Sequence, residues 1–388
     1  MWIADKEKFE IQQNRSKTQD MGDDVWVRPL SHGPQRSYNI QDMKIGHRTS
    51  LKFHKLADLL KGKSRLLIVM QDNPDPDAIA AAVALRRLVN TLADMKCSIA
   101  HGGTIGRGEN RALVKYLDLN LHDLAQVSFD QFDLVALVDA QPGSGNSSLP
   151  SQVLPDIVID HHPCRRATRQ VRFSDVRKDY GATSTILWEY LVKAQITPDI
   201  TLATAMLCGI GSDTQDLGRE AMAADIDAYE ALYPLANKRM LSQIHRGTVP
   251  KEYFQMLSEA LRNARLYEDR VIVAHLGPID NPDMVGEMAD LLLREDDTIW
   301  TLCTGFCHGK LWISVRTDDQ VNRADLVVRH VVARHGTGGG HMTYAGGQIP
   351  LVKNTKSEMA HLENLVRRRF LRNLGVDERR CERLVKTD

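Results

Sequence analysis

Short runs of apolar residues constrain the fold of this chain more than any other feature. Residues 65–70, 132–138 and 156–159 have strand length and are almost continuously apolar. Continuous rather than alternating apolarity is typical of parallel strands that are buried on both faces. Helical patterns, such as those at 78–93 and 183–194, alternate with these runs. The sequence therefore predicts an α/β fold with a doubly wound, mainly parallel sheet.

Acidic residues follow each of the three runs. They are Asp72, Asp75 and Asp77 after the first run, Asp139 after the second, and Asp160 with His161 and His162 after the third. In open α/β sheets, ligand sites lie beyond the carboxyl ends of the strands, so we expect these side chains to converge on one edge. Carboxylates held together repel one another unless a cation lies among them. The pattern thus predicts a cation site.

A second pattern of strands and helices begins near residue 269 and predicts a smaller α/β domain, with the active site in the cleft between the two domains. A glycine-rich loop is expected at 335–347, and it does not match a P-loop because no Gly-Lys-Ser/Thr follows. The predicted organisation is a loosely ordered polar extension over 1–45, a first domain over 46–235, a helical linker over 236–268 and a second domain over 269–388.

The residue types favour a hard metal ion. Asp75, Asp77, Asp139 and Asp213 offer oxygens and His161 and His162 offer imidazoles, a set that suits Mn²⁺ or Mg²⁺. A carboxylate between two ions can bridge them at roughly 3.5–4 Å, as two-metal phosphoryl hydrolysis requires. An alternative stays open for the acids after the first run, since one Asp there could cap the following helix.

The composition limits the classes of substrate and partner to expect. The chain of 388 residues has 50 basic and 50 acidic side chains, so its formal net charge is zero. This balance favours a short substrate over long duplex nucleic acid, and no apolar run predicts a membrane span. The six cysteines lack a framework spacing, which favours free thiols and a cytoplasmic location. Cys303, Cys307 and His308 do not complete a zinc site.

The ordered motifs resemble the DHH phosphoesterase superfamily. These motifs are NPDPDA (73–78), VDA (138–140), IDHH (159–162), GATST (181–185), GSDT (211–214) and GTGGGHMTYAGG (336–347). The last resembles the signature of the DHH-associated C-terminal domain. Within the superfamily, the chain looks most like the branch of nano-RNases, 3′-phosphoadenosine-5′-phosphate (PAP) phosphatases and cyclic-dinucleotide phosphodiesterases.

The resemblance implies roles for individual residues. Asp75 is expected to bind a first metal ion, and Asp77 and His162 a second, with Asp139 bridging both and Asp213 completing the cluster. His161 is expected near the scissile phosphate or behind the metal ligands, and Asp160 is expected to orient a histidine. The predicted substrate contacts are Arg316, Gly339, Gly340 and His341, with Asn322 and Arg323 as weaker candidates. Arg107 and Asn110 could reach the site or belong to a surface loop. A homodimer is expected by the same analogy.

One residue departs from the family pattern. Most members have His four positions before the first Asp of the Asp-x-Asp pair, where this chain has Gln71. A carboxamide oxygen is a weak, neutral ligand. Three alternatives follow: two Mn²⁺ or Mg²⁺ ions with a looser first site, a site that works with one ion, or an altered or lost activity.

The implied activity is that of a hydrolase. We expect a metal-dependent phosphoesterase that cleaves small nucleotides or short oligonucleotides through a metal-bound hydroxide, with Asp139 and His161 at the reaction centre. The alternative from another class is a nucleotide-binding or sensing protein on the same scaffold, in which Gln71 has weakened or abolished catalysis.

Overall fold

The structure is a computed structural model that describes residues 45–218, 221–319 and 321–385, all of which belong to one unit, Met43–Asp388. The extension predicted over 1–45 lies outside the described residues except for Ile45. The other boundaries predicted for the domains and the linker stay a prediction.

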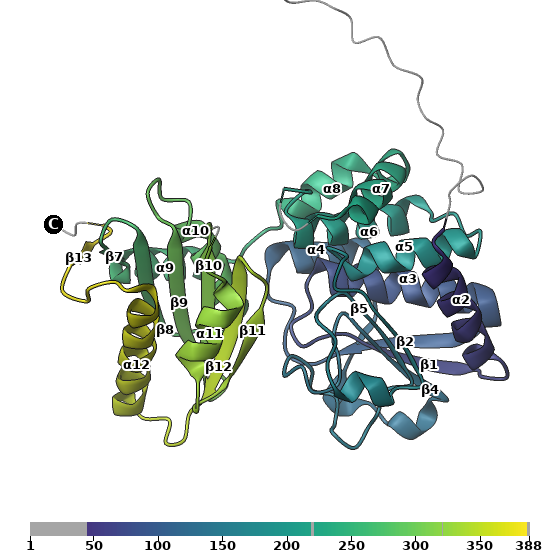
Figure 1. The fold of residues 1–388 in the computed structure, drawn as a ribbon, viewed down its shortest axis with the longest axis horizontal. Coiled ribbons are helices and arrows are strands. Elements are labelled where there is room, and N and C mark those ends of the chain that lie inside the picture. Colours follow the sequence, from purple (N-terminus) through teal and green to yellow (C-terminus); the bar gives the residue numbers. More distant parts are fainter. Residues whose placement is uncertain (1–44, 219–220, 320, 386–388) are drawn as a thin grey trace, which may run out of the picture. The chain divides into compact units, whose positions relative to one another are not determined.

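The first half of the described chain is built on a parallel sheet of six strands (Figure 1). The strands are β1 (Arg65–Val69), β2 (Lys96–His101), β3 (Leu121–Asp123), β4 (Leu134–Val138), β5 (Ile157–Asp160) and β6 (Phe173–Val176). Their order is β3-β2-β1-β4-β5-β6, and every neighbouring pair is parallel. The α/β fold with a mainly parallel sheet, predicted from the apolar runs, is confirmed.

Helices follow the sheet strands as the periodicity predicted. The helices of this half are α2 (His47–Leu60), α3 (Pro76–Ala93), α4 (Gly108–Tyr116), α5 (Thr183–Lys193), α6 (Ile200–Thr214), α7 (Ala223–Leu232) and α8 (Lys238–His245). Helix α3 packs against both α5 and α6. The other side of the sheet has an apolar cluster in which Leu67, Leu137 and Val158 meet Leu124 and Phe129 from the segment between β3 and β4.

The second half forms a mixed sheet of seven strands in the order β11-β12-β10-β9-β8-β7-β13. Its strands are β7 (Arg265–Tyr267), β8 (Val271–Pro278), β9 (Trp300–Cys307), β10 (Lys310–Thr317), β11 (Thr337–Gly340), β12 (Tyr344–Pro350) and β13 (Cys381–Arg383). Its helices are α9 (Lys251–Asn263), α10 (Asp283–Leu292), α11 (Ala324–Val332) and α12 (Lys356–Leu374). One apolar cluster joins the sheet to α11 and α12, and another joins it to α9 and α10.

The glycine-rich segment differs from its prediction as a loop. Strands β11 and β12 pair antiparallel in a hairpin, and β12 pairs in turn with β10. The glycines allow this because the segment lies against a helix: a Cβ on Gly338 or Gly347 would come within 2.8–2.9 Å of the Val328 or Val332 side chain. The prediction of a loop was wrong because glycine has low strand propensity and this close packing is a tertiary effect.

No helix within residues 45–218, 221–319 or 321–385 has the length and hydropathy needed to cross a bilayer.

Candidate metal centre and the adjoining cavity

The predicted acids meet where the strand order reverses. From β1 the chain proceeds outward to β2 and β3, and then returns to β4, which pairs with β1 on its other side. Asp75 and Asp77 follow β1, and Asp139 follows β4. The carboxyl ends of two adjacent strands therefore bring these residues to one edge, at the type of switch point where α/β sheets bind ligands.

Asp75 and Asp77 open helix α3 in different ways. Asp75 is the N-cap, since its Oδ1 accepts a hydrogen bond from the Ala78 amide at 2.9 Å, so the capping alternative is correct for this residue. Asp77 is fully buried, and its two oxygens accept from the Thr183 and Ser184 amides at 2.7 and 2.9 Å. These amides belong to the first turn of α5, where free N–H groups favour a negative charge.

Asp139 is buried with an unsatisfied oxygen. Its backbone is left-handed (φ 54°), which Asp tolerates better than most residues. Thr183 Oγ1 donates to Asp139 Oδ1 at 2.9 Å, whereas Oδ2 has no partner among the described residues. Burial raises the pKa of Asp139 well above its ordinary range, and Asp75, Asp77 and Asp213 raise it further. An unpaired buried carboxylate oxygen is costly, and a cation would remove that cost.

His161 directs one ring nitrogen into this group. Its Nδ1 lies 3.2 Å from the Tyr180 carbonyl oxygen, which can only accept, so Nδ1 carries the proton. Nε2 lies 3.2 Å from Asp213 Oδ2 and 3.5 Å from Asp139 Oδ1, without the alignment of a hydrogen bond to either. In a neutral ring, the Nε2 lone pair is therefore available to a metal ion. Burial alone would lower the pKa of His161, but Asp213 and then Asp77 and Asp160 raise it to about 10.

Asp213 completes a group of four. It lies in the last turn of α6. Burial and then Asp75 raise the pKa of Asp213 to about 8. Asp77, Asp139, His161 and Asp213 each offer a ligand atom, and these four atoms lie within 4.8 Å of one another. Three carboxylates and one imidazole fit Mn²⁺ or Mg²⁺. We call these four residues the core cluster.

His162 lies beside the core cluster and faces the second sheet. Its Nδ1 lies 2.8 Å from Asp160 Oδ1 and 3.9 Å from Asp139 Oδ1. Its Nε2 lies 3.1 Å from Nε2 of His341. A second set of ligand atoms within 4.8 Å contains Asp139, Asp160, His161 and His162, so the structure leaves the predicted role of His162 as a metal ligand open.

Asp160 contacts His162 as an orienting residue would. Besides His162, Asp160 accepts a hydrogen bond from Gln141 Nε2 at 2.5 Å. Burial alone would raise the pKa of Asp160, but the charge and hydrogen bond of His162, with His161 and Gln141, lower it below its ordinary value. Asp160 therefore stays ionised and can fix the ring of His162.

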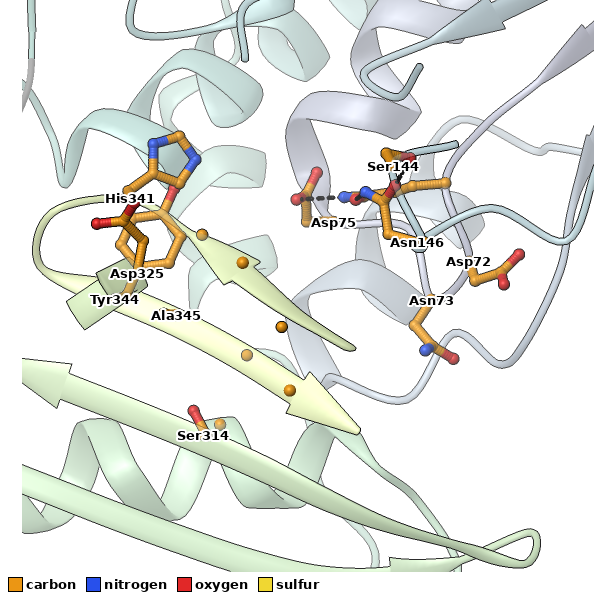
Figure 2. Close-up of a pocket in the computed structure, with 18 of the residues that line it drawn as sticks. Asp72, Asn73, Asp75, Ser144, Asn146, Ser314, Asp325, His341, Tyr344 and Ala345 are labelled. Atoms are coloured by element: carbon orange, nitrogen blue, oxygen red, sulfur yellow. Dashed lines mark hydrogen bonds between the residues drawn. The ribbon is translucent and has the colours of Figure 1, made fainter. Parts of the chain in front are cut away.

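Gln71 contacts Asp75 through its nitrogen. Its Nε2 donates to Asp75 Oδ2 at 2.7 Å, and its Oε1 accepts from Asn146 Nδ2 at 2.8 Å. Asn146 Oδ1 in turn accepts from Ser144 Oγ, so the hydrogen bonds run in one chain from Ser144 to Asp75 (Figure 2). Asp72 accepts hydrogen bonds from the amide and the hydroxyl group of Ser148 and so holds the same loop.

The predicted substrate residues line a cavity of about 840 Å³ that also reaches Asp75, His162 and Asp213. Asp77, Asp139 and His161 are buried and do not form its wall. Gly339 and Gly340 lie at the end of β11, and His341 lies in the turn, where its ring stacks on Tyr344 at 4.5 Å (Figure 2). Apart from the weaker candidate Asn322, the residues predicted as ligands or substrate contacts lie in the wall of this cavity or in the core cluster.

Arg316 enters the cavity from β10 with defined partners. Its Nε donates to Asp290, its Nη1 donates to Ser314 Oγ at 2.7 Å, and the guanidinium lies 5.6 Å from the centre of the Tyr344 ring. Arg107 lies 3.7 Å from the same Asp290 and also lines the cavity. Of the two alternatives for Arg107, a residue that reaches the site or part of a surface loop, the structure favours the first. The cavity therefore combines carboxylates near the core cluster with two guanidinium groups that share the Asp290 carboxylate.

The weaker candidates fall in different places. Asn110 is buried and donates to the Pro74 carbonyl at 2.9 Å, which supports the loop between Asp72 and Asp75. Arg323 lines the cavity and pairs with Asp325, whereas Asn322 donates to Asp319 and does not line it.

Sequence reasoning missed several residues that organise the site. They are Gln141, Ser144, Asn146, Thr183, Asp290 and Tyr344. Thr183 and Tyr344 lie within the motifs at 181–185 and 336–347 but received no predicted role. The stretch 140–148, rich in Gly, Ser and Asn, follows β4 and also carried a local signal, since loops after parallel strands lie near the ligand site. Asp290 sits within a helix, and its pairing with Arg316 across 26 positions has no local signal.

The fold and the site together define a class of metal-centred α/β protein, and comparison with known proteins places the chain in a family. Residues 65–210 match the N-terminal domain of the DHH family, and residues 268–368 match the DHHA1 domain. The chain belongs to the DHH family and carries a DHHA1 domain.

Curated relatives of the chain carry different functional names. An uncharacterized protein of Methanocaldococcus jannaschii is 32% identical over 340 residues, 86% of this chain and 68% of that protein. A probable manganese-dependent inorganic pyrophosphatase of Lactobacillus gasseri is 26% identical, over 60% of this chain and 76% of that protein. The cyclic-di-AMP phosphodiesterase GdpP of Bacillus subtilis is 23% identical over 84% of this chain, which spans about half (52%) of GdpP.

A solved structure shares the fold. An exopolyphosphatase-related protein from Bacteroides fragilis superposes with a TM-score of 0.63 at 16% identity, and the match covers 84% of this chain and 97% of that one. At this identity the likeness shows the fold alone.

Proposed function

We propose that this protein is a metal-dependent phosphoesterase that hydrolyses phosphate esters of small nucleotides or short oligonucleotides. The observation that carries the proposal is the core cluster, in which the buried atoms Asp139 Oδ2 and His161 Nε2 have no hydrogen-bond partner within the part of the chain that the structure describes. Relatives named as a manganese-dependent pyrophosphatase and as a phosphodiesterase support phosphoryl hydrolysis as the class of reaction.

The core cluster would hold a divalent ion, preferably Mn²⁺. Such an ion would lower the pKa of water and would polarise the phosphoryl oxygen. The chain's own residues prepare this chemistry: the α5 amides fix the Asp77 carboxylate, Thr183 fixes Asp139, and the Tyr180 carbonyl fixes the tautomer of His161. His161 is in this proposal a ligand, and His162, with His341, faces the substrate phosphate.

The arginines and aromatic rings that line the cavity favour an anionic substrate with a planar group. Arg316 and Arg107 would neutralise phosphate oxygens, because a guanidinium matches their geometry with two donors. Tyr344, Trp312 and His341 offer ring faces for a base. The GdpP match extends over most of this chain, whereas the pyrophosphatase match covers 60% of it, which favours a nucleotide over pyrophosphate.

The test is a panel of substrates with Mn²⁺: short dinucleotides, cyclic dinucleotides, PAP and pyrophosphate. We expect product from at least one nucleotide with the wild-type protein, and loss of product with Asp139→Ala. Asp130→Ala is the matched control, because Asp130 is exposed in the segment that precedes β4. Absence of metal-dependent product from every substrate would contradict the proposal.

A second candidate is a nucleotide-binding or sensing protein with weakened catalysis. The observation that favours it is the hydrogen bond from Gln71 to Asp75. Gln71 stands at the position where the family pattern has a histidine, which is a stronger metal ligand. Nucleotide binding measured by calorimetry without hydrolysis would select this candidate.

A further inference from the structure

Helix α10 presents one face to two arginine side chains. Asp283, Gly286 and Asp290 lie three and four positions apart in this helix and therefore share a face. A Cβ on Gly286 would lie 2.8 Å from Arg107 Nη2 and 3.2 Å from Arg316 Nη2. Because Gly286 has no side chain, the two guanidinium groups, one from the start of α4 and one from β10, can approach the same turn of α10.

Asp290 is the carboxylate that both guanidinium groups share. Arg316 donates to Asp290 Oδ1 through Nε and to Oδ2 through Nη2, the latter at 3.4 Å. Arg107 Nη2 lies 3.7 Å from the same Oδ2. Two like charges this close repel each other unless an opposite charge lies beside them. Asp290 therefore holds Arg107 and Arg316, which we call the arginine pair, together and cancels one of their two charges.

Further acids surround Arg107. Asp283 accepts a hydrogen bond from the Arg107 amide at 3.2 Å. Burial alone would lower the pKa of Arg107, but Asp290 and then Asp283 raise it. The charges of Glu109 and Glu287 act in the same direction. The arginine pair is therefore a site for an anion of low charge, although both guanidinium groups stay ionised.

The arginine pair lies close to the acids that follow β1. Burial raises the pKa of Asp283, and Asp75 raises it further. Both arginines line the cavity that also reaches Asp75 and Asp213. A compound whose phosphate is held by the pair therefore lies within electrostatic reach of the residues that the proposed function places at the metal centre.

We propose that Asp290 is a specificity-determining residue that restricts the arginine pair to a phosphate group with one negative charge, which is a phosphodiester. This inference rests on the proposed function and narrows its substrate class. A single negative charge neutralises the arginine pair and Asp290 together, whereas a second charge has no partner and is repelled by the Asp290 carboxylate. Cyclic dinucleotides and the internal phosphodiesters of short oligonucleotides fit this rule, and PAP and pyrophosphate do not.

The test compares two ligands that differ by one charge. Adenosine 3′,5′-cyclic monophosphate is a diester with one charge, and adenosine 5′-monophosphate (AMP) carries two at about pH 8, because the second pKa of a phosphomonoester is about 6. Calorimetry with the full chain in a chelator gives each Kd without turnover. Asp290→Asn keeps the shape of the side chain and removes its charge.

The expected effect follows the charge of the ligand. Because the Coulomb energy is proportional to that charge, we expect Asp290→Asn to lower the Kd of AMP about tenfold and that of the cyclic nucleotide about threefold. An equal change for both ligands would overturn the proposal. A higher Kd for both would also overturn it, because Asp290 would then only hold the arginine pair together.

Two further variants separate local charge from other causes. Asp325→Asn removes the same charge from the wall of the same cavity, but Asp325 pairs with Arg323 and Arg329. We expect both Kd values to stay within about twofold of the wild type, since these charges lie outside the arginine pair. Effects equal to those of Asp290→Asn would contradict the role of Asp290. Asp290→Glu keeps the charge and should keep the wild-type ratio of the two Kd values; a ratio like that of Asp290→Asn would assign the effect to packing.

The substrate panel with Mn²⁺ distinguishes this inference from the proposed function. With the wild-type protein, we expect cyclic dinucleotides to have a higher kcat/KM than PAP. Absence of hydrolysis together with the expected Kd values would reject the proposed function alone. Hydrolysis together with equal changes in the two Kd values would reject the role of Asp290 alone.

Discussion

At the scale of single residues, two adjacent histidines take different positions. His161 follows β5 directly and contacts the carboxylates of the core cluster, whereas His162 contacts Asp160 and His341. The two rings lie 4.4 Å apart, but only His161 also reaches Asp213 and thereby joins the core cluster. The motif predicts that histidines matter here, but it does not say which one enters.

We predict that His161→Gln weakens Mn²⁺ binding at the core cluster at least tenfold, because it removes an imidazole ligand; even outer partners of metal ligands contribute 10–100-fold. His162→Gln should change this Kd less than threefold and reduce turnover instead. Calorimetry with Mn²⁺ measures the first effect, and the substrate panel measures the second. The opposite ranking of the two Kd values would return the ligand role to His162.

The raised pKa values predict how pH acts on the metal-free protein. Asp213 has a folded pKa of about 8 against an ordinary value of 3.8, and His161 has about 10 against 6.5. Both groups hold protons in the folded state that the unfolded chain releases, so their contribution to stability is present at low pH and is lost as the pH rises through these folded values.

Mn²⁺ must displace these protons, so its affinity should increase with pH. We expect the rise in thermal midpoint caused by Mn²⁺, relative to a chelator, to be larger at about pH 8.5 than at about pH 6. A midpoint shift that does not depend on pH would contradict this account.

At the scale of elements, helix ends and one hairpin position the site. The first turn of α5 binds Asp77 through two amides, and the start of α3 is capped by Asp75. The β11–β12 hairpin places His341 beside His162, and its turn depends on Gly340, whose φ is +149°. A Cβ there would lie 2.5 Å from both Ala345 Cα and the Tyr344 carbonyl oxygen.

We predict that Gly340→Ala destabilises the protein by about 1–3 kcal/mol, because a side chain in this conformation is strained and has no space. The thermal midpoint should fall by a few degrees and KM should rise as His341 moves. Gly339→Ala is the matched control, since a Cβ at Gly339 has no atom within 4 Å in the structure. Its thermal midpoint should stay within about a degree. Equal loss of stability in both variants would show that the hairpin geometry is not the cause.

At the scale of the whole molecule, the two sheets contribute different groups to the site. The core cluster comes from the first sheet and its helices, whereas Arg316 comes from β10 of the second sheet. If the proposed function holds, metal binding and substrate binding should be separable by mutation. The predicted homodimer and cytoplasmic location stay predictions.

We predict that Arg316→Gln raises KM about ten- to a hundredfold, since hydrogen bonds to charged groups contribute about 1.5–3 kcal/mol. The Kd for Mn²⁺ should not change, because Arg316 pairs with Asp290 and not with the core cluster. Arg172→Gln is the control, because Arg172 is exposed and pairs with Asp156. A weaker Mn²⁺ Kd in Arg316→Gln would contradict this separation of roles.

The sequence by itself determined the parallel sheet and the residue types of the metal centre, because burial on both faces demands continuous apolarity and like charges in a row demand a cation. Only the tertiary structure decided which histidine enters the core cluster, how Gln71 is oriented, and that the glycine segment is a hairpin. Those outcomes depend on partners far along the chain, such as Asn146 for Gln71 and Val328 for Gly338, and no local pattern encodes them.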